Sequence, residues 1–463
     1  MNLADLSAIL PVKTVRGDGG VEVAALAYDS RAVRPGTAFV CVKGFRLDGH
    51  EFARDALSRG AVAMIAERET GVHEVPHVLV PDSRRALALL SSHFYGHPSK
   101  NMRVTGVTGT NGKTTTTHLV RWVLARVGRE AGLIGTIENV VCGRPLPVER
   151  TTPEALDLQG LFNDMRGCGS SHVVMEVSSH AIELDRVAGT EFDVAVFTNL
   201  TQDHLDFHPD MESYFGAKSR LFTGLGGTYY AAPKQGKKAA VINVDDGYGA
   251  RLARMVGRAD LVTYGLSEAA AFRAEGVEIG PRGSRFRAIT PGGVVNLNVR
   301  LAGMFNVYNI LAAIAVAWVE GIPSDEAARA VEDHPGVPGR FQLVDEGQPF
   351  SVVVDYAHTP DGLRNVLEAA RGIARGRLIC VFGCGGDRDR RKRPIMGEIA
   401  AGLADYCVIT SDNPRSEDPL AIIREIEPGV KRAGRTPGDY AVQPDRRAAI
   451  ETALERARPG DVV

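Results

Sequence analysis

A glycine-rich segment near residue 110 has the residue types and spacing of a loop that binds phosphate. It follows an apolar run at 103–107 and reads Thr108-Gly109-Thr110-Asn111-Gly112-Lys113-Thr114-Thr115. Glycines let backbone N–H groups point at phosphate oxygens, and the N-terminus of a following helix adds a partial positive charge. We expect Lys113 to reach the β- and γ-phosphates and the Thr114 hydroxyl to bind Mg²⁺. The strict pattern places a glycine where this chain has Val107, so a turn without a ligand is the alternative.

Two residues suited to metal binding follow the next predicted strands. Glu176 ends an apolar run at 172–177, and His204 comes shortly after the run at 194–199. In an open parallel sheet the carboxyl ends of the strands face the ligand crevice, so both residues fall on the edge that carries the phosphate loop. A carboxylate and an imidazole there can hold a divalent metal, although each alone is more often a turn cap or a hydrogen-bonded histidine. Lys218 has the spacing of a solvated lysine on a helix.

Strand and helix patterns divide the chain into three α/β blocks. Residues 1–100 mix short apolar runs with helical patterns, which predicts a small α/β domain that ends in a linker at 97–100. In residues 101–335 strands alternate with helices, which predicts a P-loop ATPase-like domain with a mostly parallel sheet covered on both faces. The predicted strands of this domain are 103–107, 172–177, 194–199 and 239–243.

The end of the second block and the whole third block have patterns of their own. Residues 257–299 alternate apolar and polar side chains, which indicates an antiparallel edge, and residues 306–320 predict a helix. After a linker at 335–338, residues 336–463 predict a Rossmann-like, doubly wound third domain. Its strands are expected at 351–355, 377–382 and 406–410, and its helices at 361–373 and 394–403.

The composition is that of a soluble globular protein. The chain has 463 residues, 44% of them apolar and 24% charged, and a formal net charge of -2, which argues against nonspecific binding to nucleic acid or anionic membranes. No apolar run approaches the roughly 18 residues that span a bilayer, and the start does not have the pattern of a signal peptide. The six cysteines are scattered without zinc-type spacing. We therefore expect reduced thiols in a cytoplasmic protein.

Several motifs together resemble the Mur ligase family. Besides the phosphate loop they are Glu176-Val177-Ser178-Ser179-His180, the segment 199–204 and Ala217-Lys218. Two more motifs resemble the type that adds the third residue to UDP-N-acetylmuramoyl-L-alanyl-D-glutamate: Asp355-Tyr356-Ala357-His358-Thr359-Pro360-Asp361 and Asp412-Asn413-Pro414-Arg415. The resemblance runs from Tyr28 to the last residues and so covers nearly the whole chain.

The resemblance implies a cytoplasmic ATP-dependent ligase of peptidoglycan precursor synthesis. In that family the first domain holds the UDP end of the substrate, the second binds ATP with Mg²⁺, and the third brings the incoming amino acid. The reaction forms an acyl phosphate on the D-glutamyl γ-carboxylate, which the amine of meso-2,6-diaminopimelate then attacks, with release of ADP. We expect a monomer that neither spans a membrane nor binds nucleic acid.

Site residues carry over from the family position by position. The resemblance implies catalytic roles for Lys113, Lys218, Arg340 and His204, with Lys218 carbamylated by CO2. It implies metal binding by Thr114, Glu176, His204 and the modified Lys218. The ATP positions are Gly109, Thr110, Asn111, Gly112, Lys113, Thr114, Thr115, Asn306, Asn309, Arg340, Asp355 and His358.

The UDP-sugar side carries over less completely. The family positions are Tyr28, Ser30, Phe45, Arg46, Thr151, Thr152, Ser178 and Arg186. Phe45 and Arg46 replace a histidine–glutamine pair of some relatives, Arg150 replaces an asparagine, and Leu184 replaces a glutamine. These departures affect the details of the uridine and peptide contacts and leave the class of ligand unchanged.

The amino acid that is added is indicated by two arginines. In the family, Asp412-Asn413-Pro414-Arg415 goes with diaminopimelate, and Arg388 resembles the second arginine of that site. The far carboxylate of diaminopimelate, which lysine lacks, fits a bidentate guanidinium. An ordinary turn after the strand at 406–410 is the alternative for this motif. The chain stops at Gly460-Asp461-Val462-Val463, before the Gly-Lys-Gly-His-Glu segment of relatives, so we expect a truncated or differently built amino-acid pocket.

Two other functions stay open at this point. One is a lysine-adding ligase of the same type, or another amide ligase such as a folylpolyglutamate synthase. The other is a nucleotide-binding regulatory or scaffold protein that has lost catalysis. Substrate exchange in an ADP-release assay separates the ligases from one another, and phosphate release that depends on an amino acid excludes the inactive protein.

Overall fold

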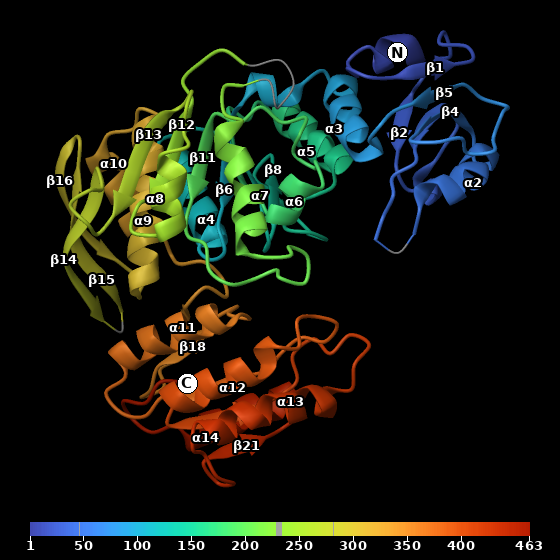
Figure 1. Cartoon of the computed structure of the whole chain (residues 1–463). Coiled ribbons are helices and arrows are strands. Elements are labelled where there is room, and N and C mark those ends of the chain that lie inside the picture. The colour runs from blue at the N-terminus through green and yellow to red at the C-terminus, as the bar shows by residue number, and fades with distance from the viewer. Residues whose placement is uncertain (46, 228–233, 281) are drawn as a thin grey trace.

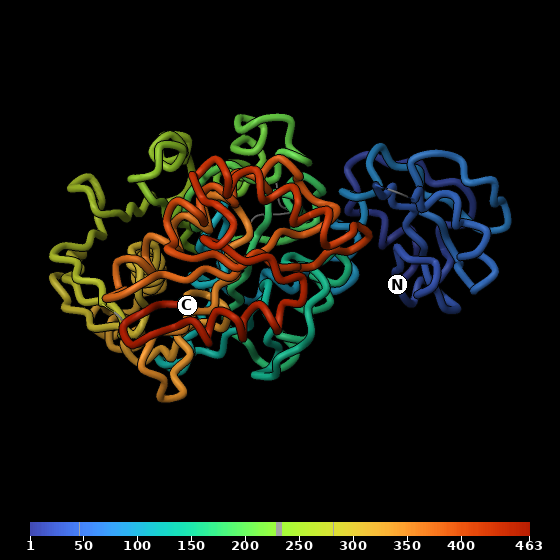
Figure 2. The backbone as a smooth tube through the Cα atoms, turned by 90° about the horizontal axis from the view of Figure 1, so that it is seen from below, coloured from blue at the N-terminus to red at the C-terminus, as the bar shows by residue number. Residues whose placement is uncertain are grey.

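The computed structural model describes residues 1–45, 47–227, 234–280 and 282–463. Three α/β units follow one another along the chain, and the N-terminal unit lies to one side of the other two in both views (Figures 1 and 2). The predicted fold class is thereby confirmed: three α/β domains, with mostly parallel strands in the centre.

The N-terminal unit is a small sheet with short helices. Its strand order is β1-β5-β4-β3-β2; β1 is antiparallel to β5, and the other pairs are parallel. The strands are β1 (Thr14–Arg16), β2 (Ala25–Ala27), β3 (Thr37–Val40), β4 (Ala61–Ala66) and β5 (His77–Leu79), and the helices are α1 (Leu3–Ser7), α2 (Ala53–Ser58) and α3 (Ser83–Phe94).

The central sheet has 11 strands in the described residues, in the order β16-β15-β14-β13-β12-β11-β6-β10-β7-β8-β9. The run from β7 to β14 is parallel, and the outer strands at both edges pair antiparallel. The antiparallel edge predicted for 257–299 is confirmed for β14, β15 and β16, whereas β13, in the same range, is parallel to both of its neighbours. The strands are β6 (Arg103–Thr108), β7 (Ala131–Ile134), β8 (Asn139–Val141), β9 (Arg144–Leu146), β10 (His172–Glu176), β11 (Val194–Phe197), β12 (Ala239–Asn243), β13 (Asp260–Gly265), β14 (Phe272–Gly280), β15 (Gly283–Thr290) and β16 (Gly293–Val299).

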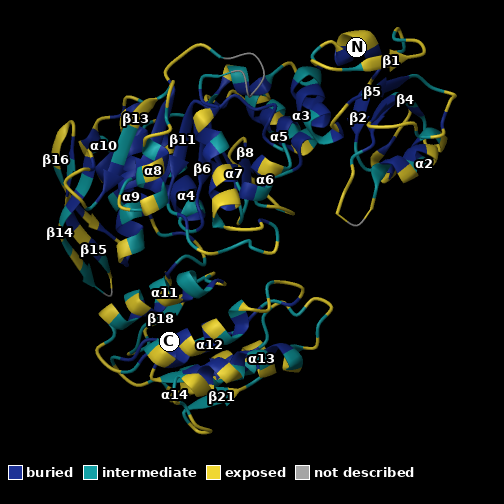
Figure 3. Cartoon of the chain, in the orientation of Figure 1, coloured by how far each residue is buried: buried dark blue, intermediate teal, exposed yellow. Residues whose placement is uncertain are grey.

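Helices cover both faces of the central part of this sheet, which explains why the strands there, such as β10, β11 and β12, are buried on both sides (Figure 3). In β11, Val194 and Val196 pack in one core with α4, α9 and α10, whereas Ala195 and Phe197 pack in the other with α5, α6, α7 and α8. Alternate side chains thus enter two separate cores. The helices are α4 (Lys113–Arg126), α5 (Ala155–Gly167), α6 (Ser179–Glu183), α7 (Met211–Thr223), α8 (Gly247–Ala253), α9 (Met304–Val319) and α10 (Ser324–Glu332).

The third unit contains a parallel three-stranded sheet, β19-β20-β21, and a separate antiparallel pair, β17-β18. The strand predicted at 351–355 is present as β18, but it lies outside the parallel sheet, and β17 was not predicted. Val462 forms parallel bridges with both Ser351 and Leu378, so the end of the chain lies between the two sheets. The strands are β17 (Gln342–Val344), β18 (Val352–Val354), β19 (Ile379–Phe382), β20 (Tyr406–Ile409) and β21 (Tyr440–Val442), and the helices are α11 (Pro360–Ile373), α12 (Lys392–Leu403), α13 (Pro419–Arg432) and α14 (Arg446–Arg456).

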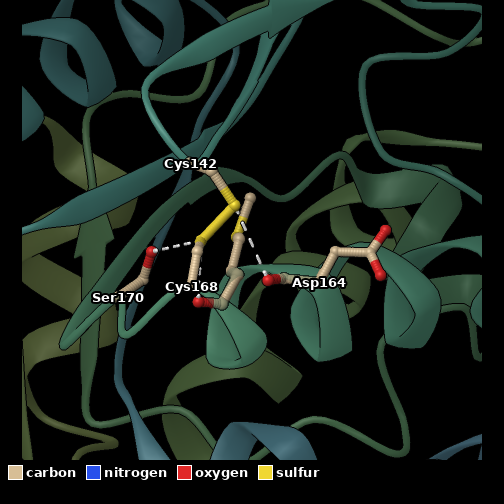
Figure 4. The surroundings of a disulfide bond; sticks show 5 residues. Cys142, Asp164, Cys168 and Ser170 are labelled. Carbon is tan, nitrogen blue, oxygen red and sulfur yellow. Dashed lines mark hydrogen bonds between the residues drawn. A yellow bond between two sulfur atoms is a disulfide. The ribbon is translucent and has the colours of Figure 1, made fainter.

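The expectation that all cysteines are reduced is wrong for one pair. Cys142, in the turn between β8 and β9, is disulfide-bonded to Cys168 at the end of α5, 26 residues away, with the Cα atoms 5.8 Å apart (Figure 4). Spacing along the chain gave no sign of this pair, because the sheet brings the two together. The free cysteines are Cys41, Cys380, Cys384 and Cys407, all buried.

No helix in the described part of the chain is long and apolar enough to cross a membrane.

The disulfide should stabilise the central unit. Cys142→Ser combined with Cys168→Ser frees a segment of 26 residues, and the chain-entropy model gives a loss of about 3 kcal/mol for a loop of this size. We expect the melting temperature of the oxidised wild type to fall by several degrees in the double variant. Dithiothreitol should lower the wild-type value similarly and leave the variant unchanged. Equal melting temperatures of oxidised wild type and variant would contradict the role.

Candidate active site

The phosphate-type loop lies between the end of β6 and the start of α4, as its sequence predicts. Gly109 has φ +148°, and a Cβ there would lie 1.8 Å from Thr198 Oγ1, at the end of the neighbouring strand β11. Gly112 has φ +86°, and a Cβ there would lie 2.5 Å from Asn309 Oδ1. Both positions therefore require glycine, for backbone conformation as well as for space.

Two lysines from different helices converge on this loop. Lys113 Nζ donates to the carbonyls of Gly109 at 3.0 Å and Thr110 at 2.8 Å. Lys218 Nζ, from α7, donates to the same Gly109 carbonyl at 2.9 Å. The two predicted catalytic lysines are thus brought to one oxygen at the strand ends.

Lys218 is not the solvated lysine that its spacing indicated. The side chain is buried, with Nζ 4.8 Å from the centre of the Tyr214 ring. Burial, and then the charge of Lys113, hold the pKa of Lys218 well below its ordinary value. A low pKa favours the neutral amine, which is the nucleophilic form of lysine.

Glu176 lies at the end of β10 and is held by one threonine. Its carboxylate accepts the Thr136 backbone N–H at 2.8 Å and the Thr136 hydroxyl at 3.0 Å. The Thr136 hydroxyl is also 3.1 Å from that of Thr151, a predicted substrate residue. A carboxylate has about four lone-pair positions, so these bonds leave capacity for a cation.

His204 follows β11 in a left-handed backbone conformation, with φ 55°. Its ring centre is 4.8 Å from that of His180, which stacks on Phe207 at 4.0 Å. Burial lowers the pKa of His204 well below its ordinary value, so the ring is neutral near pH 7 and can donate a lone pair. The predicted metal set contains only two residues of the His, Cys, Asp and Glu types, and the described residues hold no group of three such side chains arranged so that they could bind a metal ion. The metal ligands stay predictions.

Arg340, from the third unit, reaches the phosphate-type loop. Its Nη2 donates to Thr114 Oγ1 at 3.0 Å, and its guanidinium stacks over the Tyr356 ring at 4.6 Å. Its Nε is buried, and within the described residues it has no hydrogen-bond partner. The arginine and the hydroxyl thus meet across a boundary between two units, as the predicted roles of both require.

The other predicted nucleotide residues are held by local hydrogen bonds. Asn306 and Asn309 are buried on α9 and bonded to each other, and Asn309 Oδ1 accepts from Thr116. The Asp355 carboxylate accepts the backbone N–H groups of Phe341 and Ala357, and His358 Nδ1 lies 3.1 Å from the Tyr356 carbonyl. Their contacts with a nucleotide stay predictions.

Asp361 is a site residue that sequence reasoning missed. From the first turn of α11, its Oδ2 accepts Asn111 Nδ2 at 2.9 Å and the Thr201 hydroxyl at 3.1 Å, both in the central unit. It follows a Thr359 N-cap and Pro360, where an acidic residue has an ordinary explanation in the helix dipole. Only the fold shows that this carboxylate joins the third unit to the phosphate-type loop.

Four predicted substrate residues meet beside Glu176. The Thr152 hydroxyl donates to the Glu176 carbonyl at 2.9 Å and lies 3.3 Å from the Ser178 hydroxyl. Arg186 Nη1 donates to the Thr152 carbonyl at 3.2 Å, and Thr151 adjoins them through its link to Thr136.

The N-terminal unit brings further predicted residues to this edge. Tyr28 donates from its hydroxyl to Asp157 on α5, at 2.6 Å. Phe45 contacts Phe207 edge-on, with ring centres 5.9 Å apart. Ser30 is buried within the N-terminal unit, and Arg46 lies outside the described residues.

The predicted diaminopimelate residues lie in two adjacent loops after β19 and β20. Arg415 Nη1 donates to the Gly386 carbonyl at 2.6 Å, and the Gly386 N–H donates to the Asn413 carbonyl at 2.9 Å. Arg388 belongs to the first loop, and Asp412, Asn413, Pro414 and Arg415 belong to the second. Below them the buried Arg393 binds Glu417 and the Gly385 carbonyl, which fixes the loops against each other.

Three family models match the chain in order. They are described as the Mur ligase family catalytic domain over residues 22–95, the Mur ligase middle domain over 107–317 and the Mur ligase glutamate ligase domain over 339–463.

Named relatives match over the full length. The UDP-N-acetylmuramoyl-L-alanyl-D-glutamate--2,6-diaminopimelate ligase of Geobacillus thermodenitrificans is 48% identical over 463 residues, which is 100% of this chain and 93% of the relative. The protein of the same name from Listeria monocytogenes is 46% identical, over 100% of this chain and 92% of its own.

Solved structures agree with this fold. A structure of a UDP-N-acetylmuramoyl-L-alanyl-D-glutamate--2,6-diaminopimelate ligase has a TM-score of 0.72 and 32% identity, over 100% of this chain and 93% of its own. The MurF ligase from Thermotoga maritima in complex with ADP has a TM-score of 0.65 and 23% identity, over 96% of this chain and 93% of its own, and supports the fold alone.

Replacing Asp361 with alanine should loosen the third unit on the central unit. A hydrogen bond to a charged group contributes about 1.5–3 kcal/mol, so losing the contacts to Asn111 and Thr201 should lower amide protection in 109–115 by about tenfold. Hydrogen–deuterium exchange measures this. Glu368→Ala removes an exposed acid from the same helix and should leave the loop unchanged. Equal hydrogen–deuterium exchange of residues 109–115 in Asp361→Ala and Glu368→Ala would contradict the proposed role of the Asp361 contacts.

Proposed function

The chain belongs to the Mur ligase family, and on that premise we propose that it joins meso-2,6-diaminopimelate to UDP-N-acetylmuramoyl-L-alanyl-D-glutamate at the expense of ATP. The bond forms at the D-glutamyl γ-carboxylate, in a step of peptidoglycan precursor synthesis. The observation that carries this proposal is the meeting of Lys113 and Lys218 at the Gly109 carbonyl, with Arg340 reaching Thr114 from the third unit.

The first step makes the carboxylate reactive. An oxygen of the γ-carboxylate attacks the γ-phosphorus of ATP, the bond to the β-phosphate oxygen breaks, and ADP leaves with that electron pair. Lys113 and Arg340 supply positive charge beside the moving phosphoryl group, which is where such transfers need stabilisation. Because Arg340 comes from the third unit, full stabilisation requires that unit to be docked.

The residues present fit a magnesium ion, which would neutralise charge on the phosphates. Thr114 offers a hydroxyl, Glu176 has lone pairs beyond those bonded to Thr136, and His204 is neutral. Lys218 as an ammonium would repel the ion. Its neutral amine can add to CO2, forming a C–N bond and releasing a proton, and the resulting carbamate carries oxygens that suit Mg²⁺.

The second step forms the amide. The neutral amine of diaminopimelate attacks the acyl carbon, the nitrogen loses a proton, and phosphate leaves from the tetrahedral intermediate with the electron pair of the broken C–O bond. Water would hydrolyse the acyl phosphate, so the site must be closed during both steps. The contacts of Asp361 with Asn111 and Thr201 hold the third unit over the loop and serve that closure.

The three units divide the substrates among them. We propose domains at 1–100 for the UDP-sugar, 101–335 for ATP and 336–463 for diaminopimelate. On the UDP-sugar side, Thr151, Thr152, Ser178 and Arg186 hold the peptide end beside Glu176. The protein acts as a cytoplasmic monomer in this proposal.

A product-formation assay with a panel of amino acids tests the proposal. With ATP, Mg²⁺ and UDP-N-acetylmuramoyl-L-alanyl-D-glutamate, we expect ADP release and a new amide with meso-2,6-diaminopimelate, and much less with lysine. Preference for lysine would indicate the lysine-adding type, and activity on folate with glutamate would indicate another amide ligase. No release of ADP with any pair would identify a nucleotide-binding protein without catalysis.

Arg415 should set the preference for diaminopimelate. Arg415→Lys keeps the charge but loses the bidentate geometry that suits a carboxylate. Because one hydrogen bond between charged groups is lost, we expect the KM for diaminopimelate to rise about tenfold or more. The KM for ATP should not change. Arg391→Lys, at an exposed position nearby, is the matched control. An unchanged ratio of activities on diaminopimelate and lysine would exclude this role.

A further inference from the structure

Three arginines surround a single carboxylate at the seam between the N-terminal and central units. Glu154 Oε1 lies 2.5 Å from Arg150 Nη1 and 3.0 Å from Arg186 Nη2, and its Oε2 lies 3.5 Å from Arg84 Nη1. Arg84 belongs to the first turn of α3, whereas the other residues belong to the central unit. The cluster therefore joins the two units.

The cluster has more positive than negative charge in partly buried surroundings. The side chains of Arg84, Arg186 and Glu154 are 19%, 13% and 10% exposed, whereas that of Arg150 is 52% exposed, at the solvent side of the cluster. Asp157 lies nearby, but it accepts the Tyr28 hydroxyl, and burial raises its pKa. Even if Asp157 is ionised, three guanidinium groups face two carboxylates. Uncompensated charge in such surroundings costs free energy, so the seam favours one more anion.

The arginines also reach the segments that the proposed function assigns to the substrate. Arg84 Nη2 donates to the Lys43 carbonyl at 3.1 Å, in the loop that carries Phe45. Arg186 Nη1 donates to the Thr152 carbonyl, and its Nε is buried without a partner in the described part of the chain. Each guanidinium has five N–H donors in a planar fork, the geometry that suits an oxyanion.

We infer that Glu154 is an internal counter-ion that an oxyanion of the acidic substrate displaces, and that Arg84 and Arg150 bind this oxyanion together with Arg186. The inference rests on the proposed function, whose substrate offers two such groups, the diphosphate and the glutamyl α-carboxylate. Arg150 supplies the third guanidinium of the cluster from its more exposed side.

Displacement follows from electrostatics. The Glu154 carboxylate offsets the mutual repulsion of the three guanidinium groups and keeps them converged. An entering phosphate or carboxylate that bound the same guanidinium groups would lie close to Glu154 and be repelled by it. When Glu154 moves away and the arginines bind the substrate oxyanion instead, the repulsion between Glu154 and that oxyanion falls. Arg84 then connects the two units by way of the substrate.

Binding measurements on charge variants test this inference. Isothermal titration with UDP-N-acetylmuramoyl-L-alanyl-D-glutamate should show that Glu154→Gln binds about three- to tenfold more tightly than wild type, because the competing carboxylate is gone. Its affinity should also fall more steeply with added KCl. Glu149→Gln removes a neighbouring exposed acid for which the described residues show no ion pair, and it should bind like wild type.

Arg150→Asn installs the residue of the family pattern and should bind about two- to fivefold more weakly than wild type, with a shallower salt dependence. Titration with UDP-N-acetylglucosamine distinguishes the two anions. If Glu154→Gln also binds this probe more tightly, the diphosphate occupies the cluster; if the gain needs the dipeptide, the glutamyl carboxylate does.

Weaker or unchanged binding of the dipeptide substrate by Glu154→Gln would overturn the inference, since Glu154 would then be a permanent structural partner of the arginines. If the variants fail these expectations while the wild type still binds the substrate and forms product, the proposed function stands and only the inference about Glu154 is refuted. Folded wild type that neither binds the substrate nor forms product refutes the proposed function itself.

Discussion

Two lysines that share one backbone carbonyl define the centre of this protein. Lys113 and Lys218 both donate to Gly109, at the tips of β6 and α4. A carbonyl is only a dipole, so it cannot balance two cations, and burial lowers the pKa of both lysines. In the proposed reaction, the arrangement becomes electrostatically favourable when phosphate binds at Lys113 and when the Lys218 amine is converted to a carbamate. Both changes make the site suitable for phosphoryl transfer.

The same centre explains why a third unit is needed. The phosphate-type loop has no arginine of its own, and Arg340 arrives across the boundary to meet Thr114. Asp361 adds an anchor at Asn111, which is itself held by Asn199 and Thr198 at the end of β11. Docking of the third unit thus acts on the phosphate-type loop through the ends of the strands. The acyl phosphate is protected from water only in the docked state, which is also the state in which Arg340 completes the positive charge of the site.

The fold could be predicted well from the sequence because the patterns that indicate strands, turns and helices lie within short segments of the chain. Apolar strands with a glycine-rich turn and a helix predicted the parallel core. The alternation within 257–299 correctly indicated the antiparallel strands at 272–299, whereas the strand at 260–265 is parallel to its neighbours. Features that depend on contacts between distant segments were missed. Lys218 was predicted to be exposed because periodicity does not reveal which helix face is covered, and Asp361 was named only as part of a motif, without a role. The Cys142–Cys168 bond depends on how the β8–β9 turn meets α5, which no spacing rule encodes.

The seam at Glu154 and the loop at Lys113 both hold cations in place before an anionic ligand binds, but the partners that hold them differ in charge. At the loop, lysines are held by neutral carbonyls, which an incoming phosphate outcompetes easily because it carries full charge. At the seam, arginines are held by a full carboxylate, so the substrate must displace an equal charge and gains less net affinity. In return the three guanidinium groups are kept converged beforehand, which reduces the ordering cost of binding. The substrate seam is thus preorganised by a charged partner, whereas the nucleotide loop is restrained only by dipoles.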